Sequence, residues 1–176
     1  KCMQIQTKKR FYYKNLIQAG KIKVRRGVLR LIEELSFFNV DQYIVTTSGR
    51  ESLYPFLETS LKSHLKFFTK IITYEDVINH KPFPDAYNLA KQLSKKPCIN
   101  CLVIEDSKIG IEAARAASLN CLLTLPPWSS SSHKVSKMAN ACVDSLGDND
   151  QNTKLIYGKP LVNFNVDFAY LTNIIN

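Results

Sequence analysis

The stretch Leu102-Val103-Ile104-Glu105-Asp106-Ser107 decides the fold of this 176-residue chain. It begins with an apolar run, passes into two adjacent carboxylates, and is followed from Lys108 by an alanine-rich helical pattern. A short apolar run bounded by a polar turn and a helix predicts a buried parallel strand. Ser107 is then placed to be the N-cap of the helix. Glu105 and Asp106 would lie at the carboxyl end of a central strand, where open α/β sheets bind their ligands.

Two neighbouring acids at that place suit Mg²⁺, a hard ion held by a few carboxylates and by the oxygens of a phosphate. A plainer interpretation is that Glu105 and Asp106 merely cap the following helix. The spacing alone favours neither interpretation.

On both sides of this stretch, strand-like and helix-like segments alternate. Buried strands are expected at residues 43–45, 70–73, 102–104 and 120–124, with a short edge strand at 141–143. Helices are expected at residues 3–19, 28–38, 51–61, 86–93 and 166–175, and a loop at 147–154. This order predicts a doubly wound α/β fold with mostly parallel strands.

Composition limits the function classes. Hydrophobic residues make up 45% of the chain, which argues against disorder, and no apolar run approaches the roughly 20 residues of a membrane span. The net charge is +9, and ten Lys and Arg residues precede the first acid, Glu33. Such a basic segment predicts attraction to polyanions such as phosphorylated metabolites, nucleic acid or anionic lipid.

The cysteines and one histidine are assigned structural roles. Five cysteines, two of them in strand-like runs, favour a reducing compartment over a disulfide framework. Cys98-Ile-Asn-Cys101 has the spacing of a redox motif, which we consider the less favoured interpretation. His133 ends a serine-rich stretch, residues 129–132, and is expected to be a surface residue in a loop.

Two further segments contain residue types that can bind a phosphate. Thr46-Thr47-Ser48-Gly49-Arg50 follows the strand at 43–45 directly, so hydroxyls, backbone N–H groups and a helix N-terminus can together cradle a phosphate. Ser48 with Glu51 also has the form of a capping box, and both roles are compatible. Lys81, before a proline-stiffened turn, can offset charge near the carboxylates. From local sequence alone, however, it is a solvated loop lysine.

Together these segments resemble the haloacid dehalogenase superfamily of phosphohydrolases. The resemblance rests on Val45-Thr46-Thr47-Ser48, on Lys81-Pro82-Phe83-Pro84-Asp85-Ala86-Tyr87, and on Val103-Ile104-Glu105-Asp106-Ser107 with Gly110 following, in this order. The forms of the last two are similar to the β-phosphoglucomutase-like branch, and within it to CbbY-type sugar phosphatases. The resemblance covers about residues 5–146.

The resemblance implies a Rossmann-like core (23–176) and, at residues 1–22, a remnant of a helical cap. It implies that Thr46 binds the transferring phosphoryl group with donors near Thr47 and Ser48, and that Lys81 balances its charge. Glu105 and Asp106 would hold Mg²⁺. A distal phosphate of the substrate would be bound by Lys9, with Arg25 and Arg50 as further candidates argued from charge and position.

The family's first motif, Asp-x-Asp-Gly-Thr after an N-terminal strand, does not occur in residues 1–176. That motif supplies the aspartate nucleophile, so we expect this chain, which begins at Lys1, to be a fragment that is inactive by itself. A core without that strand should also expose a sheet edge beside residues 102–104.

The expected function is a Mg²⁺-dependent phosphatase that acts on a sugar phosphate or bisphosphate through an aspartyl-phosphate intermediate. A phosphosugar mutase, or an inactive phosphate- or polyanion-binding relative, is the alternative. We expect no nucleic-acid partner and no membrane association, and a location in the cytoplasm or plastid stroma. The oligomeric state and the sugar are not predicted.

Overall fold

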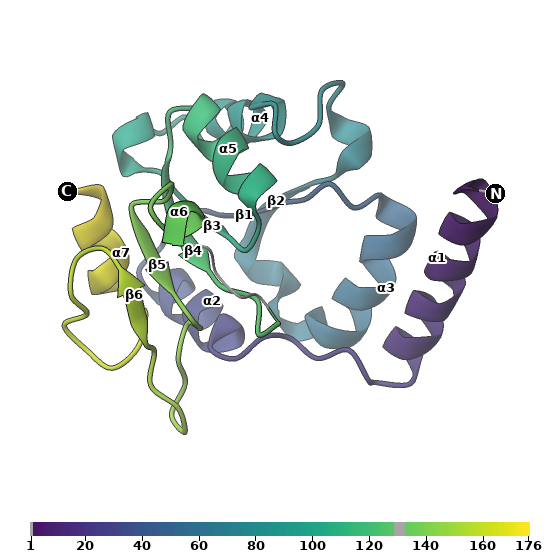
Figure 1. Cartoon of the computed structure of the whole chain (residues 1–176), viewed down its shortest axis with the longest axis horizontal. Coiled ribbons are helices and arrows are strands. Elements are labelled where there is room, and N and C mark those ends of the chain that lie inside the picture. Colours follow the sequence, from purple (N-terminus) through teal and green to yellow (C-terminus); the bar gives the residue numbers. More distant parts are fainter. Residues whose placement is uncertain (1, 129–132) are drawn as a thin grey trace.

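The computed structural model describes residues 2–128 and 133–176. Figure 1 shows its elements in chain order. The α-helices are α1 (Cys2–Gln18), α2 (Val28–Phe37), α3 (Arg50–Ser60), α4 (Asp85–Ser94), α5 (Lys108–Ala116), α6 (His133–Ser136) and α7 (Phe168–Ile175). The strands are β1 (Gln42–Val45), β2 (Phe68–Ile72), β3 (Leu102–Glu105), β4 (Asn120–Thr124), β5 (Ala141–Val143) and β6 (Leu155–Tyr157). Short 3₁₀ helices cover Lys62–Phe67, Tyr74–Asp76 and Cys98–Asn100.

The strands form two sheets. β1 pairs with β2 in parallel, and a second sheet has the order β3-β4-β5-β6, in which β3, β4 and β5 are parallel and β6 is antiparallel. The expected alternation of strands and helices and the mostly parallel pairing are confirmed, and the strands fall into two sheets because no described strand lies between β1 and β3. The exposed edge expected beside residues 102–104 is therefore present. β6 was not expected, since three residues carry too little pattern to identify a strand.

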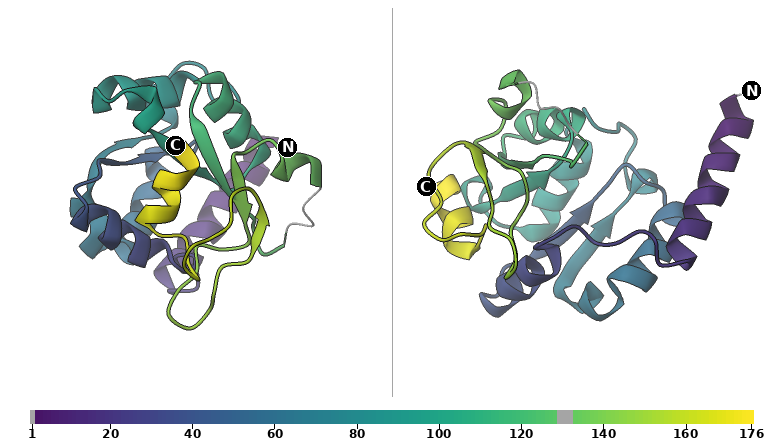
Figure 2. Two further views of the ribbon diagram at one scale, coloured as in Figure 1. Left: turned by 90° about the vertical axis from the view of Figure 1, so that its left-hand side faces the viewer. Right: turned by 60° about the horizontal axis from the view of Figure 1, so that its bottom comes forward.

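Helices cover both faces of the strands. In Figures 1 and 2, α4 and α5 lie on one side and α2 and α7 on the other. Ile111, Ala113 and Ala114 of α5 are fully buried and pack in one cluster with Cys121 and Leu123 of β4. A second cluster joins α2 and α7 to the opposite face of β4 and β5. Burial on both faces explains why β4 is nearly all apolar rather than alternating.

α1 stands apart from the sheets and contacts α3 (Figure 2). Ile17 is its buried apolar anchor, whereas Phe11 and Tyr12 are 61% and 64% exposed. An extended segment without regular structure then leads from Gly20 toward α2. The division of the chain at residues 22 and 23, and the assignment of residues 1–22 to a cap, stay predictions.

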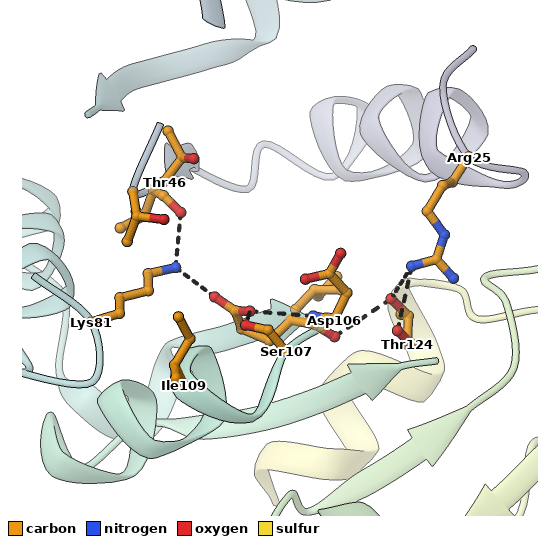
Figure 3. Close-up of a pocket in the computed structure, with 11 residues that line it drawn as sticks. Arg25, Thr46, Lys81, Asp106, Ser107, Ile109 and Thr124 are labelled. Atoms are coloured by element: carbon orange, nitrogen blue, oxygen red, sulfur yellow. Dashed lines mark hydrogen bonds and ion pairs between the residues drawn. The ribbon is translucent and has the colours of Figure 1, made fainter. Parts of the chain in front are cut away.

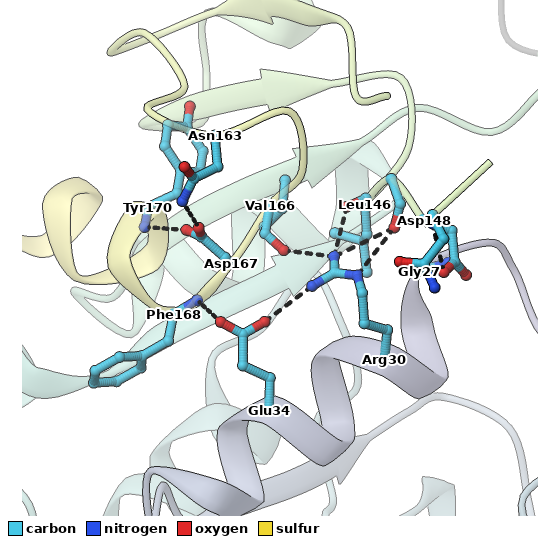
Figure 4. Close-up of polar contacts among 12 residues, drawn as sticks. Gly27, Arg30, Glu34, Leu146, Asp148, Asn163, Val166, Asp167, Phe168 and Tyr170 are labelled. Atoms are coloured by element: carbon cyan, nitrogen blue, oxygen red, sulfur yellow. Dashed lines mark hydrogen bonds and ion pairs between the residues drawn. The ribbon is translucent and has the colours of Figure 1, made fainter. Parts of the chain in front are cut away.

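Three arginines of the basic N-terminal segment form hydrogen bonds and ion pairs with other parts of the chain. Arg30 bridges Glu34 at 2.9 Å, Leu146 O at 2.9 Å and Val166 O at 2.7 Å, as Figure 4 shows. The other carboxylate oxygen of Glu34 accepts a hydrogen bond from the N–H of Phe168 at 2.9 Å. Arg26 pairs with Asp150, and Arg25 binds main-chain carbonyls near β4. The expectation of an unopposed positive face is thus wrong for these three charges, because main-chain carbonyls and carboxylates of the same chain engage them.

Cysteine chemistry and membrane insertion can be compared with the structure directly. Cys98, Cys101, Cys121 and Cys142 are free thiols. Burial raises the pKa of the Cys101 thiol, which disfavours the thiolate that a redox motif requires.

In the described part of the chain, no helix is both long and apolar enough to cross a bilayer. Residues 129–132 and the side chain of His133 lie outside the described part.

Candidate functional site

A polar pocket of about 320 Å³ lies where β1 and β3 end (Figure 3). Parallel strands bring their carboxyl ends to one edge, and so side chains 60 residues apart in sequence meet here. The residues that line the pocket come from both sheets and from the segment before α2: Arg25, Val45, Thr46, Thr47, Lys81, Ile104, Glu105, Asp106, Ser107, Ile109 and Thr124.

β1 delivers two hydroxyl side chains to the pocket. The N–H of Thr46 is held by Ile72 O of β2 at 2.9 Å, which fixes the end of the strand. The Thr46 hydroxyl oxygen accepts a hydrogen bond from the N–H of Ser48 at 3.0 Å, so its O–H is left to donate to a ligand. Thr47 is exposed and lines the same pocket. The predicted position of Thr46 and Thr47 at one site is thus supported by their geometry.

The Glu105 carboxylate is fully occupied by neighbours. One oxygen accepts hydrogen bonds from Lys81 Nζ and the Tyr87 hydroxyl, each at 2.5 Å. The other accepts from Asp106 N at 3.2 Å and from the Ser107 hydroxyl at 3.1 Å. A carboxylate has about four lone-pair sites. Glu105 is therefore saturated and buried, and it organises the residues around it.

Lys81 is buried as well. Its ammonium donates to Glu105, to Val45 O at 3.0 Å and to the Tyr87 hydroxyl at 2.9 Å, and its side chain is 7% exposed. These contacts use all three N–H donors. The default interpretation of a solvated loop lysine is wrong, because the turn that follows directs Lys81 between the two sheets. Burial, and then the charge of Glu105, raise the pKa of the Tyr87 hydroxyl, so Tyr87 stays a hydrogen-bond donor.

Gly110 in the first turn of α5 makes room for this carboxylate. A Cβ at Gly110 would lie 1.9 Å from one Glu105 oxygen and 2.0 Å from the carboxylate carbon. The helix itself begins as predicted, since the Ser107 hydroxyl accepts a hydrogen bond from Gly110 N at 3.1 Å. Ser107 is therefore the N-cap, and the plainer interpretation of Glu105 and Asp106 as the cap does not hold.

Asp106 differs from Glu105 in having a free carboxylate. Its side chain has no hydrogen-bond or ion-pair partner among the described residues, and it is exposed to the pocket (Figure 3). Mg²⁺ is commonly bound by one or two carboxylates, with waters and substrate phosphate completing six oxygens. An unpaired carboxylate beside a second one fits such a partly protein-bound ion. No group of three His, Cys, Asp or Glu residues in the described ranges forms a closed metal cage.

Arg25 lies across the pocket from Lys81 (Figure 3). Its guanidinium donates to the hydroxyl of Thr124, the last residue of β4, at 2.9 Å and to Leu125 O at 2.6 Å. These contacts hold a positive charge at the pocket wall on the side of the N-terminal segment. Thr124 and Tyr87 are the participants that the sequence argument did not assign. For Tyr87, the available signal was its place six residues after Lys81, in the segment that carries the family resemblance.

Other predicted residues lie elsewhere. Arg50 pairs with Asp76 outside the pocket, and Lys9 is exposed on α1. Ser48 does not cap α3. The N-cap is Gly49, and the Glu75 carboxylate accepts a hydrogen bond from the N–H of Arg50 at 3.0 Å. The predicted Ser48–Glu51 capping box is wrong, because an acid 25 residues along the chain takes its place. Ser48, Arg50 and Lys9 do not line the pocket.

Comparisons with known proteins give one family. The model of the haloacid dehalogenase-like hydrolases matches residues 2–124. A CBBY-like protein of Arabidopsis thaliana is 29% identical over 133 residues, which are 76% of this chain and 41% of that protein. Protein CbbY of Rhodobacter capsulatus is 32% identical over 113 residues, 64% of this chain and 50% of the relative. This chain therefore spans about half the length of these relatives, or less.

The fold is also similar to that of a solved structure. The crystal structure of CbbY from Rhodobacter sphaeroides in complex with phosphate superposes with a TM-score of 0.71 at 24% identity, covering 81% of this chain and 63% of that one. At this identity the likeness concerns the fold. With a family model that matches most of its length, the chain belongs to the haloacid dehalogenase-like hydrolase family.

Proposed function

We propose that the pocket between β1 and β3 is the phosphate site of a Mg²⁺-dependent phosphatase acting on a sugar phosphate or bisphosphate. The observation that carries this proposal is the contrast between the saturated Glu105 and the free Asp106, beside the buried ammonium of Lys81 and the Thr46 hydroxyl, whose O–H is left to donate. The CbbY protein of Rhodobacter sphaeroides has been crystallised with phosphate and, as a mutant, with xylulose-(1,5)bisphosphate. This supports a sugar phosphate as the substrate class here.

The residues that line the pocket would have different roles. Asp106 would bind Mg²⁺ directly, and Glu105 would hold Lys81, Ser107 and the start of α5 in place. When bound, Mg²⁺ would supply positive charge that offsets the phosphoryl oxygens. The Thr46 hydroxyl would donate to a phosphoryl oxygen. Lys81 would contribute mainly its charge, because a donor to phosphate becomes available only if one of its three contacts is given up.

The nucleophile would come from outside residues 1–176. Among the described residues, Asp106 is the aspartate that lines the pocket, and its proposed role is metal binding. We therefore expect these residues to position and neutralise a phosphoryl group without transferring it. Residues 1–22, with Lys9 on α1, would belong to a cap that contacts the distal part of the substrate.

The test is a phosphate-release assay on the product of the complete reading frame that contains residues 1–176, with a panel of sugar mono- and bisphosphates. We expect release that EDTA abolishes and that Asp106→Asn or Lys81→Ala lowers by about 100-fold or more, as for other preorganised electrostatic groups. Lys108→Ala is the matched control, because Lys108 is exposed and pairs with Glu112 on the same helix. Turnover that survives Asp106→Asn with its Mg²⁺ dependence intact would refute the assignment.

Product analysis separates the phosphatase from the neighbouring mutase. With a hexose 1-phosphate as substrate, a phosphatase yields free sugar and inorganic phosphate, whereas a mutase yields the isomeric sugar phosphate. A protein that binds phosphate at the pocket and releases none would be the inactive relative.

A further inference from the structure

A pair of cysteines lies in the turn between α4 and β3, outside the phosphate pocket. Cys98 is the first residue of the 3₁₀ helix Cys98–Asn100, and Cys101 follows that helix directly before β3. Both thiols are free, Cys98 is exposed and Cys101 is partly exposed. β3 reaches the pocket at its carboxyl end, whereas the two cysteines precede its amino end. The proposed phosphate chemistry therefore makes no use of this pair.

The turn brings the main chain of the two cysteines together. Cys101 N donates to Cys98 O at 3.0 Å, and Asn100 N donates to Pro97 O at 2.9 Å. Residues three apart in a 3₁₀ turn share one face, and their Cα atoms are less than about 7 Å apart. A disulfide requires about 4.4–6.8 Å between the two Cα atoms. The backbone of this turn is thus suited to a bond between the two cysteines.

The side chain of Cys101 is directed back over the turn. Its thiol donates to Pro97 O at 3.5 Å, and Pro97 immediately precedes Cys98 in the chain. Burial, and to a smaller extent the charge of Cys98, raise the pKa of the Cys101 thiol. An effect of the Cys98 charge on Cys101 indicates that the two sulfur atoms are near each other. The hydrogen bond and the electrostatic effect therefore agree.

The surroundings of the two thiols give them different roles. The attacking group in disulfide exchange is a thiolate, so a raised pKa makes Cys101 the poorer attacking thiol. Cys98 is exposed and accessible to a reagent in solution. Residues 86–104 contain three lysines and no Asp or Glu. Such an electropositive segment favours a thiolate and attracts an anionic reagent.

We propose that Cys98 and Cys101 form a reversible redox site that reacts with an anionic low-molecular-weight disulfide such as glutathione disulfide. In the first step Cys98 loses its proton to water, and its thiolate attacks one sulfur of the reagent. The S–S bond of the reagent breaks, one glutathione leaves as a thiolate, and a disulfide between Cys98 and the other glutathione forms.

The second step takes place within the turn. Cys101 loses its proton and attacks the Cys98 sulfur, which releases the second glutathione as a thiolate and leaves a Cys98–Cys101 disulfide. The two cysteines together lose two electrons, which the reagent gains. The two protons that the cysteines lose are balanced by protonation of the two released thiolates.

Two other uses of the pair fit less well. A structural zinc ion needs four ligands, and the described residues contain no group of three or more His, Cys, Asp or Glu that could hold a metal. In disulfide oxidoreductases the thiol pKa of the attacking cysteine is lowered at the N-terminus of a helix. Cys98 instead begins a 3₁₀ helix of three residues. The pair is therefore a target of oxidation and not a catalyst of disulfide exchange in other proteins.

The test is oxidation of the whole chain by glutathione disulfide under native conditions, followed by mass spectrometry of the intact protein and of its peptides. We expect a loss of mass equal to two hydrogen atoms, with no glutathione retained, and a peptide pair linked through Cys98 and Cys101. Dithiothreitol should reverse the change completely. Cys121 and Cys142, which are 1% and 0% exposed, should stay reduced and are internal controls.

Serine variants separate the two roles. Cys101→Ser should stop after the first step and keep one glutathione on Cys98, because no second thiol can displace it. Cys98→Ser should react at least about tenfold more slowly, since the remaining thiol of the turn is partly buried and has a raised pKa. Both variants, and the protein with which they are compared, carry Cys2→Ser.

The anionic class of the reagent is tested separately. The rate of reaction with glutathione disulfide should fall as the salt concentration rises, and Lys96→Gln should also lower it. Neither change should affect the rate with the uncharged hydroxyethyl disulfide. Lys108→Gln is the matched control, because Lys108 is an exposed lysine beyond the other end of β3.

Three outcomes would overturn the proposal. No reaction, or retention of glutathione without a Cys98–Cys101 disulfide, would mean that the turn does not join the two sulfur atoms. Modification of Cys121 or Cys142 as fast as Cys98 would mean that oxidation follows unfolding. Equal salt dependence of the two reagents would mean that charge does not select the disulfide. None of these readouts involves the pocket, so the result is independent of the proposed phosphate site.

Discussion

Gly110→Ala is the substitution that most directly tests how the carboxylate network is built. In an exposed helix interior, exchange of glycine for alanine stabilises by about 1 kcal/mol. At Gly110 the new methyl would lie 1.9 Å from a Glu105 oxygen, whereas ordinary contact begins at 3.4 Å. The carboxylate must therefore move by about 1.5 Å, or α5 must shift away from β3.

Movement of that size breaks the contacts of Glu105. Its hydrogen bonds to Lys81 and Tyr87 are each 2.5 Å long, and both Lys81 and Glu105 are buried. Overpacking costs about 1–3 kcal/mol, and separating a buried ion pair can cost up to about 3–5 kcal/mol. After subtraction of the helical gain of about 1 kcal/mol from the cost of separating the pair, we expect Gly110→Ala to lower the free energy of unfolding by about 2–4 kcal/mol, measured by urea denaturation.

Gly49→Ala is the matched control. A methyl there would also meet a carboxylate, 2.7 Å from a Glu75 oxygen, but Glu75 is exposed and can swing into solvent. We expect a loss of no more than about 1 kcal/mol, the usual cost of replacing a favourable N-cap residue. In the double variant Gly110→Ala/Glu105→Ala, the carboxylate that the new methyl would meet is absent. The stability lost by the double variant should therefore be less than the sum of the losses of the two single variants. If Gly110→Ala equals or exceeds the wild type in stability, the proposed close packing is refuted.

Three further substitutions test the surrounding contacts by urea denaturation. Asp76→Asn should cost about 1 kcal/mol at neutral pH. The Asp76 carboxylate accepts hydrogen bonds from the Thr73 hydroxyl and N–H, which lower the pKa of Asp76. The stabilisation by the ionised carboxylate is therefore fully present above the ordinary pKa of 3.8 and disappears as the pH falls through the folded-state pKa. A difference in stability between variant and wild type that persists in strong acid would contradict this account. Ser107→Ala should cost about 1 kcal/mol through loss of the N-cap of α5, and no loss would argue against that cap. Tyr87→Phe should cost about 1 kcal/mol, since Lys81 and Glu105 still bind each other; a much larger loss would mean that the hydroxyl holds the pair together.

Much of the site was predictable because it depends on strand ends. The residues after β1 and β3 had to meet once both strands were parallel, and this brought Thr46, Thr47, Glu105 and Asp106 together. The helix after Asp106 was predictable from Ser107, whose capping role is local in sequence. Lys81 was placed near the acids by resemblance, but nothing local indicated its burial.

Contacts between distant segments were not predictable. Glu75 replaces Ser48 at the start of α3, and Asp76 takes the guanidinium of Arg50, although neither acid is near these residues in sequence. Local patterns likewise gave no sign of β6, which depends on pairing with β5. The division into two sheets follows from pairing across the chain, which periodicity within one segment cannot specify.

The most direct test of the central claim is an NMR titration of the labelled chain with Mg²⁺ and inorganic phosphate, which detects weak binding without turnover. We expect shifts of the amides of Thr46, Thr47, Asp106 and Ser107 that require both ions. Asp106→Asn should abolish them, whereas Asp150→Asn, at a carboxylate that is 71% exposed and does not line the pocket, should preserve them. Shifts that persist in Asp106→Asn, or that occur only elsewhere in the molecule, would contradict the assignment of this pocket as a Mg²⁺–phosphate site.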